Sequence, residues 1–282
     1  MLIGIKPRIE KPHFGVAEMD WGHPLLSRAT PKQSLLVAFN EGGTPLETIQ
    51  TNNRPLTPSG TFPTYGFNPA GLCDRAVPAA SYLAIGTEGT HITLPTASMT
   101  VAFIRRKTDT TLRASSVFGA NALNLHAPYS DGTTYWDFGG GGSPNRLTWS
   151  GYSVSMAVEY WTVVGGSRGS AIYLNGAQKA SQGTALSRAA GTIECRLNNN
   201  SAGVLGDAQD FNFFLLLDTE WTAGQVMMWF AEPYAFLRPR LAIRYWFDMN
   251  IIAAAAPEGG VLSSGGATLN TDPRAQVYAR FS

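Results

Sequence analysis

Apolar residues along the chain alternate with small or polar residues in several short runs. The clearest run covers residues 152–160, and residues 99–103 follow the same rule. This period is that of a strand with one buried face. Residues 211–217 are instead almost continuously apolar, which is typical of a strand covered on both faces. Together with the turn residues between the runs, they predict an all-β protein of antiparallel strands.

Turn residues punctuate these runs. Asn175-Gly176 follows the apolar residues 171–174 and predicts a tight hairpin, because both residue types tolerate a positive φ. Residues 57–71 carry three prolines, Pro58, Pro63 and Pro69, and are predicted to form a long loop.

One helix is predicted near the end of the apolar region. Thr222 and Gln225 form a capping-box pattern, and Pro233 ends the run. Val226, Trp229 and Phe230 share one helix face, so we expect a short helix that closes the sandwich with this face buried.

The two ends of the chain differ from the middle. Residues 1–33 are predicted to be an extended arm, residues 34–240 a β-sandwich, and residues 241–282 a C-terminal extension. The apolar residues of the N-terminal arm are expected to pack either on this domain or on a neighbouring protein. The candidate anchors of the two ends are Trp21, Leu25, Leu26, Tyr245, Trp246 and Phe247.

Charge is unusually sparse. Asp, Glu, Lys and Arg make up 15% of the chain, against about 25% in ordinary domains. The net charge of +1 gives no basic excess for nucleic acid. The basic group Arg105, Arg106 and Lys107 is therefore interpreted as a solvated strand end.

The lack of a recognisable secretory signal and the presence of only two cysteines lead us to expect that the protein folds in the cytoplasm of the cell in which it is made. The N-terminus shows no secretory signal, and residues 241–256 are too short and too interrupted by polar residues to span a membrane. We interpret Cys73 and Cys195 as free thiols in a reducing compartment.

Catalytic and metal-binding motifs are weak. The four histidines lie far apart, without the spacing of a helical zinc site. Residues 165–169 match G-x-S-x-G, yet a strand and a turn follow where a nucleophile elbow needs a helix, so we predict a loose hairpin. Residues 139–143 are expected to be a flexible glycine loop, and Asp218 and Glu220 to interact with the helix dipole. No carboxylate pair for glycoside hydrolysis can be identified, so no catalytic residue and no enzymatic activity are predicted.

Aromatic residues are the better binding candidates. Several lie near turns on either side of the glycine loop, where rings can stack on the apolar faces of sugars. The alternative is that they pack in the core. The candidates are Tyr135, Trp136, Trp149 and Trp161.

The order of segments resembles the concanavalin A-like and laminin G-like jelly-roll domains. The likeness rests on residues 98–105, 154–160, 172–176 and 211–217 with the helix after them. Residues 19–25, 39–43 and 232–239 resemble more narrowly the versions found in tailed-phage and prophage proteins. The resemblance implies a two-sheet antiparallel jelly roll with one short helix and extended arms. Enzymes of this fold use an E-x-D-x-E type strand, which this sequence lacks, and no residue matches the laminin G-like calcium site, so we predict no cofactor or metal.

This resemblance leads to three hypotheses. The first is a non-enzymatic bacteriophage virion protein, a capsid decoration that displays a lectin-like β-sandwich and is anchored by its arms. Its partners would be capsid or tail subunits and further copies of itself, without nucleic acid or membrane, in a virion assembled in the host cytoplasm. The second is a carbohydrate-binding adhesin module of a phage tail or fibre that contacts host-surface polysaccharide. The third is a glycoside hydrolase of the same fold.

Overall fold

The computed structural model describes residues 17–37, 56–60, 65–77, 79–120, 122–142, 144–199 and 206–239. The chain forms two compact units, Met1–Pro239 and Arg240–Ser282. The second unit lies outside the described residues, as do the anchor candidates Tyr245, Trp246 and Phe247.

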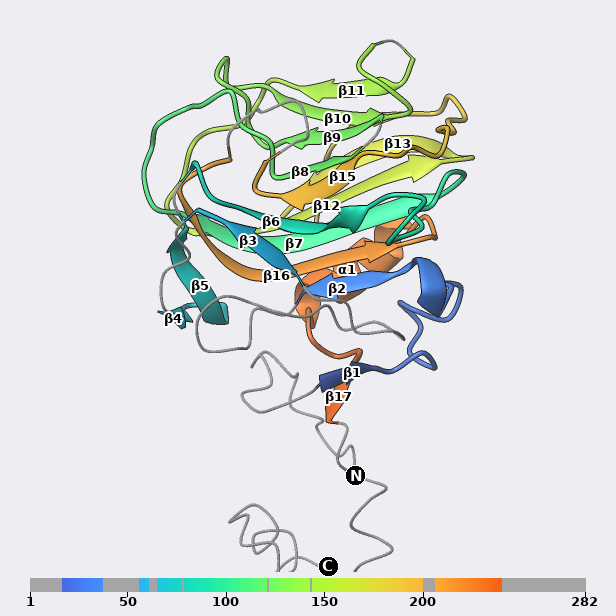
Figure 1. Ribbon diagram of the computed structural model, residues 1–282, viewed down its shortest axis with the longest axis horizontal. Coiled ribbons are helices and arrows are strands. Elements are labelled where there is room, and N and C mark those ends of the chain that lie inside the picture. The colour runs from blue at the N-terminus through green and yellow to red at the C-terminus, as the bar shows by residue number, and fades with distance from the viewer. Residues whose placement is uncertain are drawn as a thin grey trace, which may run out of the picture. The chain divides into compact units, whose positions relative to one another are not determined.

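Two large antiparallel sheets make up the described unit, which confirms the predicted sandwich (Figure 1). Sheet I has eight strands, in the order β14 (Ala177–Gln182), β13 (Gly169–Leu174), β12 (Val158–Gly166), β7 (Met99–Lys107), β16 (Gln209–Leu217), β5 (Gly71–Val77) and β4 (Tyr65–Asn68), with β2 (Leu35–Val37) also paired to β16. Sheet II has seven, in the order β11 (Arg146–Trp149), β10 (Thr134–Phe138), β9 (Leu123–His126), β8 (Phe118–Ala120), β15 (Glu194–Leu197), β6 (Tyr82–Thr87) and β3 (Thr57–Ser59). A small ribbon of β1 (Ala17–Met19) and β17 (Leu237–Pro239) and a short 3-10 helix, Pro31–Gln33, complete the strands and turns.

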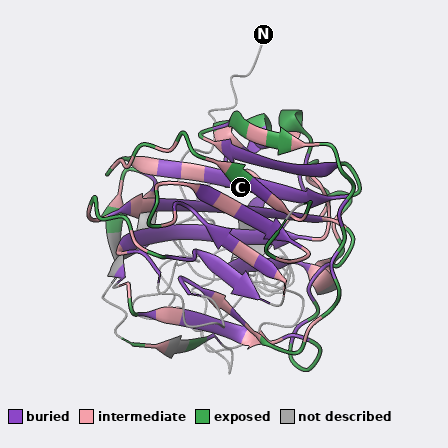
Figure 2. Ribbon diagram, turned by 90° about the horizontal axis from the view of Figure 1, so that it is seen from above, coloured by how far each residue is buried: buried purple, intermediate pink, exposed green. Residues whose placement is uncertain are grey.

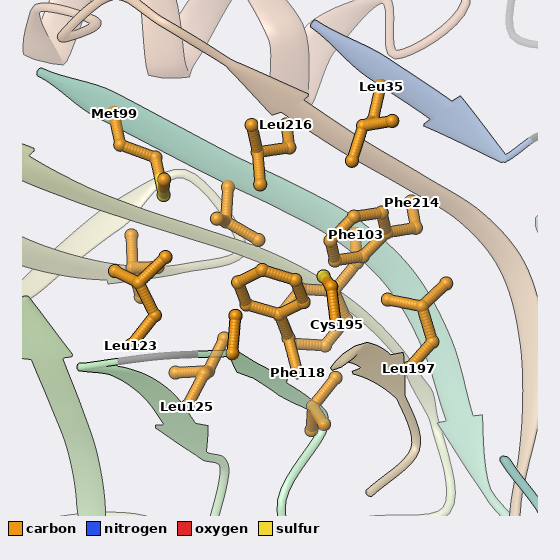
Figure 3. Packing of buried hydrophobic residues seen from close by; sticks show 14 of the residues in the cluster. Leu35, Met99, Phe103, Phe118, Leu123, Leu125, Cys195, Leu197, Phe214 and Leu216 are labelled. Atoms are coloured by element: carbon orange, nitrogen blue, oxygen red, sulfur yellow. The ribbon is translucent and has the colours of Figure 1, made fainter. Parts of the chain in front are cut away.

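The main core fills the space between the two sheets. On β7, Met99 and Phe103 point toward sheet II, where Phe118 and Leu125 lie (Figure 3), and Val101 belongs to the same cluster. Figure 2 shows the result, with strands buried along most of their length and exposed residues gathered at the connections. The period of two in the sequence thus sorts side chains to the two faces of each strand.

A second core covers the opposite face of sheet I. There Ile104 and Phe213 pack against helix α1 (Ala223–Ala231), through Val226 and Trp229. Strand β16 is therefore buried along both faces, which confirms the interpretation of its continuous apolar sequence. Met19, Leu25 and Leu26 lie in this second core, so the described part of the N-terminal segment packs on its own domain. Trp21 is partly buried against the same core.

The turn and helix predictions are confirmed. Asn175 and Gly176 have φ values of 51° and 76° and join β13 to β14. The Thr222 side chain accepts a hydrogen bond from the Gln225 backbone N–H, and the Gln225 side chain accepts one from the Thr222 backbone N–H. Both features are local, which is why the sequence specifies them without help from tertiary contacts.

Two predictions are wrong, one about where a strand begins and one about a loop. Strand β12 begins at Val158 rather than at residue 152, because Ser155 Oγ accepts a hydrogen bond from the backbone N–H of Ala157 and turns the chain there. Residues 57–71 are not one long loop, since β3 and β4 lie inside this range. Pro58 fits in β3 because this strand lies at the edge of sheet II and pairs only with β6.

Candidate functional site

A cluster of charged side chains lies buried between the sheets. Arg105 and Lys107 continue the inward-facing side of β7 and have no exposed surface, so the prediction of a solvated strand end is wrong for both. The Arg105 guanidinium lies next to the stacked rings of Phe103 and Trp161, at 5.8 and 5.4 Å from their centroids, which are themselves 6.0 Å apart. The guanidinium is thus held by aromatic faces as well as by anions.

Two carboxylates neutralise these cations. Arg105 Nε donates to Glu159 Oε2 at 3.0 Å, and Lys107 Nζ lies 3.1 Å from Asp207 Oδ1. Arg105 also donates to Gln209 Oε1 at 3.2 Å and to the Ala127 carbonyl. Burial acts to lower the pKa of the Arg105 guanidinium, but the charge of Glu159 prevails and the pKa is raised.

Glu159 has no oxygen left for a substrate. Tyr152 Oη donates to Oε1 at 2.6 Å, and Trp161 Nε1 donates to the same Oε2 that Arg105 binds, at 2.8 Å. Burial raises the pKa of Tyr152, so its hydroxyl stays protonated and remains the donor. The cluster is therefore a structural contact between the sheets, because Arg105 on β7 of sheet I donates to the carbonyl of Ala127, which directly follows β9 of sheet II.

Other buried or partly buried acidic residues are also paired with arginines. Glu88 and Arg188 form a pair whose side chains are 2% and 0% exposed. Glu220, which was expected to interact with the helix dipole, instead accepts a hydrogen bond from Arg168 Nε at 2.8 Å. Burial acts to raise the pKa of Glu220, but the hydrogen bonds from Arg168 and Ser167 outweigh it and lower the pKa. The G-x-S-x-G segment is the turn of the β12–β13 hairpin, as predicted, and Ser167 Oγ donates to Glu220 at 3.1 Å.

Two of the predicted sugar-binding aromatics are core residues. Trp136 and Trp161 are 0% exposed and point between the sheets, so they cannot stack on a ligand at the surface. The reason is strand alternation: Trp136 lies between Tyr135 and Asp137 on β10, and the inward position goes to the indole. Its Nε1 donates to the Val164 carbonyl of sheet I at 2.9 Å.

Trp149 and Tyr135 remain partly exposed. Trp149, at the end of edge strand β11, packs against the core, and Lys179 Nζ lies 5.7 Å from its ring centroid. Tyr135 lies on the outer face of sheet II. The structure therefore separates the four candidates into two core residues and two surface residues in different places.

Tyr135 belongs to a group of three rings that we call the aromatic patch: His126, Tyr129 and Tyr135. Their centroids are 5.0 Å apart for His126 and Tyr129, 6.1 Å for His126 and Tyr135, and 6.0 Å for the two tyrosines. All three contacts are edge-to-face. Both tyrosines are half-buried, so each presents part of its ring to solvent.

Hydrogen bonds fix the patch from below. His126 Nδ1 pairs with the Ser115 carbonyl, so Nδ1 carries the proton and Nε2 accepts from Asn124 Nδ2 at 2.8 Å. Ser116 Oγ donates to Asn124 Oδ1 at 2.6 Å. Burial lowers the pKa of His126, and the imidazole is neutral at pH 7.

Arg146 borders the patch. Its guanidinium binds both oxygens of Asp137, at 2.6 and 2.7 Å, and lies 4.9 Å from the Tyr135 ring centroid. Tyr135 Oη donates to Asp131 Oδ2 at 2.6 Å. The patch therefore offers ring surface beside fixed hydrogen-bonding groups, the combination that suits a polyhydroxylated ligand.

Sequence reasoning missed most of this patch. The signal available was alternation: Leu123 and Leu125 point inward, so Asn124 and His126 must point outward. What the sequence does not show is that β9, β10 and β11 lie side by side.

Within the described ranges, no group of three or more His, Cys, Asp or Glu side chains is placed to hold a metal ion. None of the helices described there is both long and apolar enough to cross a membrane. Neither Cys73 nor Cys195 forms a disulfide, and both are buried.

No protein-family model and no curated protein matches the chain. Solved structures do. Domain 4 of AbnA, a GH43 extracellular arabinanase from Geobacillus stearothermophilus solved with arabinotriose, superposes with a TM-score of 0.55 at 15% identity, covering 77% of this chain and 100% of that one. Trypanosoma rangeli sialidase gives 0.51 at 10% identity, covering 72% of this chain and 33% of the sialidase. At these identities the likeness shows the fold alone, a β-sandwich of the lectin-like kind.

Proposed function

We propose that this chain is a non-enzymatic, lectin-like β-sandwich that binds carbohydrate through the aromatic patch and is displayed on a tailed-phage virion. The observation that carries the binding role is the patch itself. Tyr129 and Tyr135 are half-buried on the outer face of sheet II, next to the fixed polar groups Asn124 and Arg146. Supporting evidence comes from the arabinotriose complex of the superposing AbnA domain. The virion setting rests on the sequence resemblance described above.

A binding role is favoured over hydrolysis by the state of the buried acids. Glycoside hydrolysis needs two carboxyl groups that face a sugar, roughly 5–9.5 Å apart. In the described residues, Glu159, Asp207 and Glu88 are each buried and paired with Arg or Lys. Incubation with polysaccharides and an assay for new reducing ends should give no turnover above a blank, and sustained turnover would overturn the non-enzymatic part of the proposal.

The binding role is tested on a glycan array. Tyr135→Ala removes one of the two partly exposed rings of the patch and is expected to abolish the array signal. Met156→Ala, at a side chain 54% exposed outside the patch, is the matched control and should bind like the wild type. If Trp149→Ala removes binding and Tyr135→Ala does not, the site is at the sheet edge and the assignment to the patch is wrong.

A second function, capsid decoration anchored by the terminal segments, is supported by the predominantly apolar stretch at residues 241–256. The structure refines its test. Because Met19, Leu25 and Leu26 are core residues, deletion of residues 1–33 would damage the sandwich itself. Deletions of residues 1–16 and of 241–282 are the suitable variants. Normal incorporation of both into particles would contradict anchoring by the ends.

A further inference from the structure

One row of residues crosses the whole of sheet II on its outer face. Strand register places these residues directly opposite one another, one from each strand: Thr57, Ala84, Arg196, Gly119, Asn124, Asp137 and Arg146. Their chain neighbours Leu83, Cys195, Phe118, Leu125 and Trp136 fill the core, so alternation turns this cross-strand row outward.

The row carries two arginine–tyrosine stacks. Arg146 on β11 lies over Tyr135 of β10, at 4.9 Å from the ring centroid. Arg196 on β15 lies over Tyr82 of β6, at 4.4 Å. Both arginine side chains are at the surface, 35% and 21% exposed. The second stack repeats the chemistry of the first on a distant part of the same sheet (Figure 1).

The two tyrosines lie on the same side of the row. Each precedes its row residue by two positions, Tyr135 before Asp137 and Tyr82 before Ala84. Strands β10 and β6 are separated by four antiparallel steps and so run in the same direction. At about 4.8 Å per strand, the stacks are roughly 19 Å apart.

Short side chains occupy the row between the stacks. Gly119 has no side chain and is itself buried, as are Ala84 and Asp137, whereas Asn124 is half-buried with its amide held by His126 and Ser116. The charges cancel at each end, because Arg146 pairs with Asp137 at 2.6 Å and Arg196 with Glu194 at 2.7 Å. From Ala84 to Arg146, the solvent-accessible part of this row therefore consists of two aromatic platforms, the arginine–tyrosine stacks, together with Asn124, with no uncompensated charge among them.

We propose that the cross-strand row is an extended binding site for a neutral linear polysaccharide, laid across the strands with one sugar ring at Tyr135 and another at Tyr82. The inference rests on the proposed carbohydrate-binding function and adds the second platform, the direction of the ligand and its class. Neutralised arginines give no advantage to an acidic or a basic polymer. A short oligosaccharide reaches only one platform.

The test uses the full chain and immobilised arabinan, galactan, mannan and dextran, with polygalacturonate and chitosan as the acidic and basic polymers. The strongest neutral binder is then titrated as its trisaccharide and hexasaccharide. The hexasaccharide should bind about tenfold or more tightly than the trisaccharide, and Tyr82→Ala should weaken it about tenfold, as should Tyr135→Ala. Tyr82→Phe keeps the ring and should bind within about threefold of the wild type.

The possible results separate three claims: carbohydrate binding, the extended site and the neutral class of the ligand. Tight hexasaccharide binding by the folded Tyr82→Ala and Tyr82→Ala/Tyr135→Ala variants would overturn the extended site and leave carbohydrate binding intact. Loss of binding in Tyr135→Ala with no effect of Tyr82→Ala restricts the site to the aromatic patch and also overturns the extension. Preference for polygalacturonate or chitosan would overturn the neutral class. Binding to none of the polymers would overturn the proposed function itself.

Discussion

The buried charged cluster should dominate the stability of the sandwich, and Arg105→Met tests this. The substitution keeps much of the apolar side-chain volume but removes one donor from each of four acceptors: Glu159, Asp207, Gln209 and the Ala127 carbonyl. Each buried acceptor that loses its partner costs roughly 1–3 kcal/mol. Glu159 and Asp207 retain other partners, Tyr152 and Lys107 respectively, so the low end of that range applies. The sum, about 4 kcal/mol, agrees with the 3–5 kcal/mol typical of a broken buried ion pair.

The assay is equilibrium unfolding in urea, which leaves ion pairs unscreened. Arg168→Met is the matched control, because the Arg168 side chain is 54% exposed in its pair with Glu220, and such a pair contributes about 0–1 kcal/mol. Arg105→Lys keeps the charge and guards against a variant that fails to fold. It should still lose stability, because an ammonium cannot reproduce the hydrogen bonds that the planar guanidinium donates to Glu159, Gln209 and the Ala127 carbonyl.

A double-mutant cycle locates the effect. Glu159→Gln should cost less than Arg105→Met, since an amide oxygen in place of Oε2 still accepts from Trp161, and the amide NH2 in place of Oε1 can donate to the Tyr152 hydroxyl. The double variant should be more stable than the sum of the single losses predicts, by on the order of 1–2 kcal/mol, because the two charges are removed together. If Arg105→Met lowers the free energy of unfolding no more than Arg168→Met does, or if the cycle is additive, the buried charged cluster does not stabilise the sandwich as the geometry indicates.

Three further predictions follow from single sites. Burial lowers the pKa of His126 in the folded state, so the unfolded chain binds a proton first and the free energy of unfolding should fall as pH drops below about 6.5. In urea titrations at several pH values, His126→Gln should make the free energy of unfolding depend less on pH. An unchanged pH dependence would refute the burial of His126 as its cause. Thr222→Ala removes the N-cap acceptor of α1 and should cost about 1 kcal/mol, measured against Thr219→Ala, whose side chain caps no helix; equal losses would contradict the capping role. Burial raises the pKa of the Cys195 thiol, so a thiol reagent should label it only after unfolding, as followed by mass spectrometry; rapid labelling of the native protein would contradict its place in the core.

Sequence alone determined the features that depend on neighbours along the chain. The Asn175-Gly176 turn needs two residues that accept positive φ, and the capping box of α1 needs a hydroxyl and an amide at a fixed spacing. Alternation also gave the strand class of β7, and the continuous apolar run of β16 correctly indicated burial on both faces. These are local properties, so no knowledge of the tertiary fold was required.

Tertiary structure decided which strands are neighbours and which way each side chain points. Arg105 and Lys107 look like a solvated strand end until β12 and the segment at Asp207 bring anions to them. Trp136 looks like a surface ring until the register of β10 turns it inward and gives the outer face to Tyr135. The pairing of Tyr82 with Arg196 depends on β6 and β15, which are more than a hundred residues apart in the chain. Sheet order and register are long-range choices made by packing, and the candidate site on sheet II exists only once they are made.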